Sequence, residues 1–156
     1  MRALIATATL ALVAACSGPQ STEVSGDNDG ILVSLSVTPA DFRVGDSVTV
    51  RLTAINRDSR PRTIVANECP LPIVVTSTDG EVLGPGERIC TAIALTKELG
   101  PDEAFMLDLQ WSGDAMRTAK HPAGVLAPGQ YYIQGSLPYD KGIAESPRVA
   151  IRIVPD

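Results

Sequence analysis

The chain has a single histidine, His121, among its 156 residues. One histidine argues against a Ser-His-Asp or Cys-His enzyme, and it excludes a metal site with several histidine ligands. Positive charge is also scarce, since 13 Lys and Arg stand against 18 Asp and Glu, for a net charge of −5 and a pI near 4.8. Nucleic-acid binding requires a basic surface patch, so this balance argues against such a partner.

Glycine and proline are abundant, with 13 and 12 residues respectively. Their combined share exceeds the average of about 12%, which favours a turn-rich β protein over a helical bundle. The length fits one domain of ordinary size and leaves no room for two independent cores.

An apolar run, residues 3–15, follows Arg2 at the N-terminus. It is shorter than the roughly 20 residues of a membrane-spanning helix, and it fits the apolar segment of a secretion signal. Residues 12–16 (LVAAC) resemble a bacterial lipobox, in which the peptide is cut before the cysteine and the cysteine is acylated. The alternative is an ordinary signal peptide with an incidental cysteine. We therefore predict a signal peptide over residues 1–15 and a membrane anchor on Cys16.

Residues 17–30 (SGPQSTEVSGDNDG) contain almost no apolar side chains. Such a segment buries too little surface to order itself, so residues 16–30 are predicted to be a lipidated cysteine and a disordered tether. As a random coil this tether spans roughly 20 Å. Because Ser17 is not the aspartate that retains lipoproteins at the inner membrane, the expected address in a Gram-negative cell is the outer membrane, facing the periplasm.

From Ile31 onward the hydrophobic pattern has a period of two, and no helical pattern of useful length occurs. Short alternating or apolar segments, about eight or nine in number, are separated by turn residues. They predict an all-β domain over residues 31–156, an immunoglobulin-like antiparallel sandwich of about seven to nine strands. The predicted strands cover residues 31–37, 47–56, 63–65, 72–76, 81–83, 89–96, 104–111, 131–137 and 147–154.

Three aromatic residues are predicted to have structural roles. Trp111 alternates in phase with Phe105 and Leu109, which favours a core position over a partner-binding anchor. In immunoglobulin-like domains a tyrosine that follows a Pro-Gly turn can bond back to the turn backbone. Tyr131 or Tyr132, after Pro128-Gly129, is the candidate for this tyrosine corner.

Residues 52–137 resemble the BsuPI domain, named for an intracellular proteinase inhibitor of bacilli. The matching motifs are a strand ending in Asn and a polar turn with Pro, a strand with an Asp-Gly turn, a turn leading to a strand that ends in Trp, and a P-G-x-Y strand. In this chain they are residues 54–56 (AIN) with 59–61 (SRP), 73–75 (IVV) with 79–80 (DG), 99–103 (LGPDE) with 109–111 (LQW), and 128–131 (PGQY). The resemblance implies an immunoglobulin-like fold and, as a second function, proteinase inhibition.

Cys69 and Cys90 form an even pair once Cys16 is lipidated. In an oxidising, exported compartment such a pair predicts a disulfide, which would close a loop of about 22 residues. A metal pair or a reactive thiol is the alternative, although two cysteines without nearby histidine make a poor metal site.

These features predict a non-catalytic, lipid-anchored β-sandwich of the cell envelope, with no cofactor and no metal. The expected partners are the membrane, through Cys16, and a protein, and the domain is expected to be a monomer. The alternative is a proteinase inhibitor that presents residues 112–127 or 137–146 as a loop. His121, in the first of these loops, is interpreted as a solvated side chain rather than a catalytic one.

Overall fold

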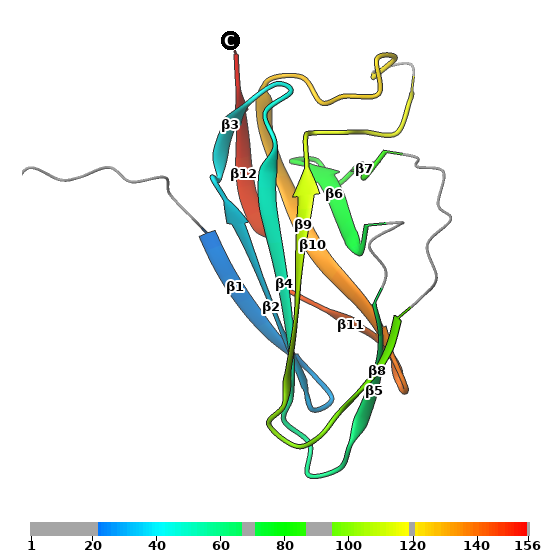
Figure 1. The fold of residues 1–156 in the computed structure, drawn as a ribbon. Coiled ribbons are helices and arrows are strands. Elements are labelled where there is room, and N and C mark those ends of the chain that lie inside the picture. Colours follow the sequence, from blue (N-terminus) through cyan, green and yellow to red (C-terminus); the bar gives the residue numbers. More distant parts are fainter. Residues whose placement is uncertain (1–21, 67–70, 87–94, 119–120, 156) are drawn as a thin grey trace, which may run out of the picture.

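The computed structural model describes residues 22–66, 71–86, 95–118 and 121–155, which form twelve β-strands and no helix. Accordingly, this part of the chain offers no long apolar helix with which to cross a membrane. The strands lie in two sheets, so the predicted all-β sandwich is confirmed (Figure 1).

The first sheet has four antiparallel strands in the order β1-β2-β4-β9. Strand β2 alternates strictly between buried and half-buried residues, as period-two patterning requires. The side chains of β2 and β4 that face the second sheet are buried, as are Leu107, Leu109 and Trp111 of β9. The bounds are β1 Thr22–Asn28, β2 Ile31–Thr38, β4 Val48–Asn56 and β9 Ala104–Trp111.

The second sheet is built around the long strand β10, which pairs with β12 and β6 near its start and with β11 and β5 near its end. β7 pairs with β6, and β8 pairs with β5. β3 pairs in parallel with β12, in contrast to the otherwise antiparallel ladders. The bounds are β3 Asp41–Arg43, β5 Arg62–Ala66, β6 Ile73–Ser77, β7 Val82–Gly84, β8 Leu95–Leu99, β10 Gly129–Tyr139, β11 Gly142–Glu145 and β12 Val149–Val154.

The core fills the space between the sheets. Trp111 is fully buried there, and its ring meets that of Phe42 edge-on, with centroids 5.9 Å apart. Its indole N–H donates to the carbonyl of Asp114 at 3.2 Å, so the one polar atom of this side chain is satisfied. Leu107 and Leu109 are buried as predicted, whereas Phe105 is only partly buried and lies 5.9 Å from the Lys97 ammonium.

The tether prediction is wrong for residues 22–30. Thr22–Asn28 form β1, which pairs along its whole length with β2. Asp29 and Gly30 both have positive φ, 48° and 86°, so they form the two-residue turn that Asp-Gly favours in hairpins. The Asn28 side-chain amide donates to the carbonyl of Glu145 and accepts from its N–H, both at 2.9 Å. Backbone pairing and the Asn28 side chain keep this segment in the sheet, although its low apolar content alone predicted disorder.

Three further differences concern strand number and position. β1, β3 and β11 were not predicted. The described residues therefore form twelve strands, more than the seven to nine expected. Residues 137–146, predicted as a loop, instead form the end of β10, a turn at Asp140-Lys141, and β11. Most of the predicted strand 89–96 lies outside the described residues, and its last two residues begin β8.

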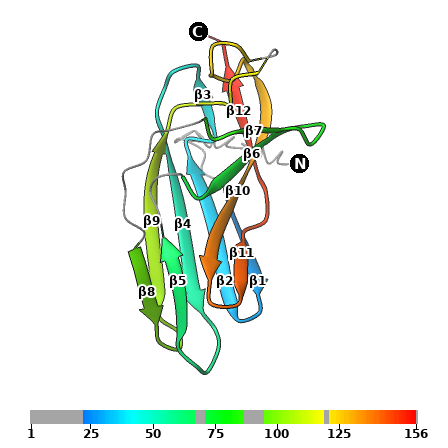
Figure 2. The same ribbon diagram turned by 90° about the vertical axis from the view of Figure 1, so that its right-hand side faces the viewer.

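The sandwich has two distinct ends (Figures 1 and 2). Residues 112–118, residues 121–128 and the C-terminal end of β12 lie at one of them, which we call the loop end. The opposite end carries the turns that follow β1, β4, β8 and β10, and we call it the charged end; its turns are residues 29–30, 57–61, 100–103 and 140–141.

Candidate functional site

Backbone hydrogen bonds join the turns of the charged end to one another. The N–H of Arg57 donates to the carbonyl of Gly30 at 2.7 Å, and the N–H of Asp102 donates to the carbonyl of Asn56 at 2.7 Å. The fully buried Asn56 side chain donates to the carbonyls of Arg60 and Leu99 at 2.8 and 2.9 Å. The turns therefore hold fixed positions relative to one another.

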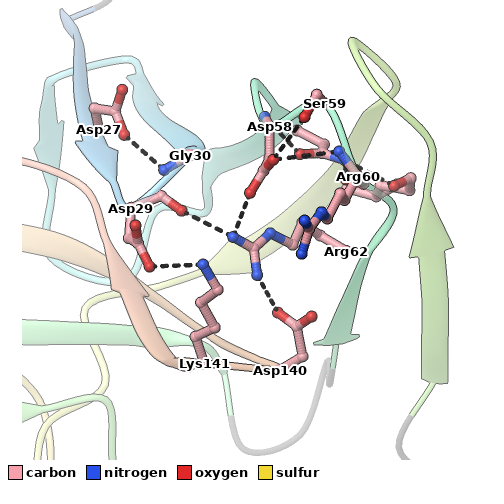
Figure 3. Close-up of polar contacts among 11 residues, drawn as sticks. Asp27, Asp29, Gly30, Asp58, Ser59, Arg60, Arg62, Asp140 and Lys141 are labelled. Carbon is pink, nitrogen blue, oxygen red and sulfur yellow. Dashed lines mark hydrogen bonds and ion pairs between the residues drawn. The ribbon is translucent and has the colours of Figure 1, made fainter.

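Arg62, on β5, is the central side chain of the charged end (Figure 3). Only 5% of this residue is exposed. Its guanidinium lies 2.5 Å from the Asp58 carboxylate and 3.6 Å from that of Asp140, and it reaches the carbonyl of Asp29 at 3.5 Å. One buried cation thus connects three turns that are distant in sequence. Its Nε has no hydrogen-bond partner among the described residues.

Two further ion pairs of the charged end are exposed. Lys141 pairs with Asp29 at 3.0 Å, as Figure 3 shows, and Arg57 pairs with Asp102 at 2.7 Å. Each exposed pair contributes only about 0–1 kcal/mol. Together they give the surface of the charged end exposed charges of both signs.

Two carboxylates of this end are held in the charged form. The backbone N–H of Arg60, followed by the charge of Arg62, lowers the pKa of Asp58. The N–H of Gly100, followed by the Lys97 ammonium, lowers the pKa of Glu103. Hydrogen bonds to a carboxylate favour its ionised state, so both stay negative under mildly acidic conditions.

The loop end is formed by residues 112–118 and 121–128, and backbone hydrogen bonds fold these two segments back onto the core. The N–H of Ala115 donates to the carbonyl of Gly124, and that of Leu126 donates to Gly113, both at 2.9 Å. The N–H of Met116 donates to the carbonyl of Leu83, which attaches the loop to β7. Ala115 and Leu126 are buried, so the predicted surface loop is partly a core element.

Tyr131 forms the predicted tyrosine corner. Its hydroxyl donates to the carbonyl of Ala127 at 2.8 Å, and burial raises its pKa. Tyr132 points to the opposite face and is half-buried. Cys16, Cys69 and Cys90 all lie outside the described residues.

His121 lines a hollow of about 420 Å³ at the loop end, together with Ser77, Asp79, Glu81 and Tyr131. Among the described residues, no hydrogen bond joins its imidazole to the hydroxyl or carboxylate groups that line this hollow. No group of three or more His, Cys, Asp or Glu side chains within the described ranges is arranged to hold a metal.

No protein-family model matches the chain. No curated protein matches it either. Among solved structures it is similar to a beta-glucosidase from Listeria innocua in complex with glucose, at 10% identity and a TM-score of 0.45, covering 86% of this chain and 16% of that one. It is also similar to the putative ApaA protein from Bordetella pertussis, at 11% identity and a TM-score of 0.32, covering 86% and 90%. At scores below 0.5 neither protein indicates what this chain does.

Sequence reasoning missed the charged end, because its residues come from four turns that only the fold brings together. Arg62 immediately precedes the short predicted strand 63–65, and nothing in its local pattern marks it as buried. The Asp29-Gly30 pair is a hairpin signal that was available in the sequence. It was outweighed by the polar composition of the residues around it.

Proposed function

We propose that the protein is a non-catalytic, lipid-anchored module of the cell envelope that binds a protein partner through its charged end. The anchor is acylated Cys16, supported by the apolar signal and the lipobox-like residues 12–16. Its expected location is a cell membrane, and in a Gram-negative organism the periplasmic face of the outer membrane. A Cys69–Cys90 disulfide remains part of this proposal.

The observation that carries the proposal is the preorganisation of the charged end. Arg62 and the bonds between turns fix the surface charges before any partner arrives, so binding does not need to order these turns. Exposed charges at fixed positions select a partner with a complementary arrangement and accelerate its encounter. Such turns on a rigid sandwich are a common place for binding residues.

Proteinase inhibition gains no support from the two loops expected to carry it. The described part of residues 112–127 is closed on itself by backbone hydrogen bonds, and residues 137–146 form a tight hairpin. An inhibitor needs an extended, exposed segment to enter a protease cleft. We therefore propose the binding module alone.

The test is a cross-linked pull-down from envelope membranes with the acylated protein. The double variant Arg60→Glu/Asp102→Lys reverses two exposed charges of the charged end, and Arg117→Glu reverses one at the loop end as the control. We expect one specific protein to be recovered with the wild type and the control, and at least tenfold less of it with the double variant. Equal recovery by all three proteins would exclude the charged end as the binding surface.

A further inference from the structure

The distance between the proposed anchor and the sandwich is limited by covalent geometry. Six peptide bonds separate Cys16 from Thr22, the first residue of β1. Fully extended, six residues span at most about 22 Å. If Cys16 is acylated, the first strand therefore begins within about 22 Å of the anchor, because β1 takes up residues that the composition assigned to the tether.

The pairing register places the beginning of β1 toward the loop end. Thr22 lies opposite Val37, Val37 opposite Val50, and Val50 opposite Leu109. Leu109 is two residues before Trp111, after which residues 112–128 begin. The other end of β1, at the charged end, is six residues away, which is about 20 Å along the strand. An anchor six residues before Thr22 therefore lies nearer in sequence to the loop-end half of β1 than to the charged end.

The loop end carries an apolar lip formed by residues 121–128. Pro122, Ala123, Val125, Ala127 and Pro128 are exposed, and together with Val44 they border a hollow of about 280 Å³. Val125 is 40% exposed. None of the described residues covers these side chains.

Internal bonds keep the lip in place. Leu126 is buried, and its N–H donates to Gly113, so its exposed neighbours on either side are directed outward. The N–H of Gly124 donates to the carbonyl of His121 at 3.1 Å, and the Tyr131 hydroxyl holds the carbonyl of Ala127. These apolar groups therefore cannot simply turn inward.

We propose that the apolar lip is a membrane-contact surface that rests against the lipid headgroups beside the anchor. This inference relies on the proposed acylation of Cys16, which supplies the proximity. Charges of both signs lie beside the lip, since Arg117 lies next to Gly124 and Val44 stands in the turn between the exposed residues Arg43 and Asp46. We therefore assign the attraction to apolar contact rather than to net charge. A weak contact suffices, since the anchor keeps its local concentration high. The charged end then points away from the membrane, toward a partner.

The test compares the acylated full chain, reconstituted in vesicles of phosphatidylethanolamine and phosphatidylglycerol, with unacylated Cys16→Ser protein added to the same vesicles. Flotation of the vesicles measures anchoring, and hydrogen exchange measures contact. We expect exchange in residues 121–128 to slow at least threefold in the acylated protein only. Exchange in residues 57–61 and 140–142, at the charged end, should not change.

Two matched variants locate the contact. Val125→Asp places a charge on the lip, whereas Ile143→Asp places one on β11, where Ile143 is 61% exposed. Both proteins should float with the vesicles, and only Val125→Asp should lose the slowed exchange in the rest of the lip. Thermal melts of the soluble domains verify that both variants fold.

Failure of the anchor and failure of the contact give different results. An acylation-competent wild type that does not float would contradict the anchor on Cys16. Flotation without slowed exchange in the lip, with slowing along β1 or the charged end instead, would overturn the membrane-contact surface. Slowed exchange that appears only after envelope proteins are added would also overturn it, because a protein and not the membrane would then cover the lip.

Discussion

A single hydroxyl connects the start of β10 to the loop end. The hydroxyl of Tyr131 donates to Ala127 from a residue that is 7% exposed. Tyr131→Phe should lower the free energy of unfolding by about 1 kcal/mol, because the bond is lost while the ring stays in place. Tyr132→Phe, on the opposite face, is the control and should change it by less than about 0.5 kcal/mol. Urea denaturation of both variants measures the difference, and equal effects would refute the tyrosine corner.

Arg62 is the other residue whose surroundings decide its energetic role. Arg62→Met keeps the aliphatic stem but leaves Asp58 and Asp140 without their buried cation. We expect a loss of about 2–3 kcal/mol, below the 3–5 kcal/mol of a fully buried pair, because both carboxylates reach solvent.

The matched variant Arg57→Met breaks an exposed pair with Asp102 and should cost less than about 1 kcal/mol. Chemical denaturation supplies both values. Equal losses of stability in the two variants would show that Arg62 does not hold the turns together.

At the scale of elements, β10 holds the second sheet together and comes very close to the first. Gly135 ends its pairing with β6, and β11 pairing begins at the next residue. A Cβ placed on Gly135 would lie only 2.2 Å from Cδ1 of Leu52, which is fully buried on β4. Gly135→Ala should therefore destabilise the domain by about 1–3 kcal/mol through overpacking.

The partner residue offers a direct check of this explanation. Leu52→Val removes the methyl group that the new Cβ would meet. In a double-mutant cycle followed by thermal unfolding, Gly135→Ala/Leu52→Val should be more stable than the sum of the two single losses predicts. Strict additivity would mean that the glycine is required for another reason.

The elements also show where sequence reasoning succeeds and where it cannot. The strands β2, β4 and β9 were predicted nearly to the residue, because alternation directly reports a strand with one buried face. β1 was missed because it is stabilised by pairing with the edge of β2 and by the hydrogen bond from the Asn28 amide to Glu145, 117 positions away. The three-residue β3 is too short for any period to be visible, and its partner β12 is more than 100 residues distant.

For the molecule as a whole, the lowered carboxyl pKa values give stability a defined pH dependence. Hydrogen bonds from backbone amides lower the pKa of Asp58 and Glu103, and the Arg51 guanidinium lowers that of Asp108. The folded state then binds fewer protons than the unfolded state below the ordinary carboxyl pKa of about 4.

Stability should consequently be fully present above pH 5 and decline as the pH falls from about 4 through the lowered values. Urea midpoints measured from pH 6 down to pH 2.5 give the slope. The variant Asp108→Asn should show a shallower decline, since one of the contributing groups no longer titrates. A midpoint that rises on acidification would contradict the assigned pKa directions.

β1 also determines how the protein responds to mechanical tension. A pull applied at Thr22 along the strand axis shears the β1–β2 ladder, so that all its hydrogen bonds bear the load together. Breaking these hydrogen bonds would lengthen β1 itself very little. A strand already rises about 3.4 Å per residue, against a limit of about 3.6 Å, so stretching β1 fully adds only about 1–2 Å. The first strand itself is therefore almost inextensible, and releasing it from β2 would turn the sandwich about Gly30, so that the charged end rather than the loop end would lie nearest the point of attachment.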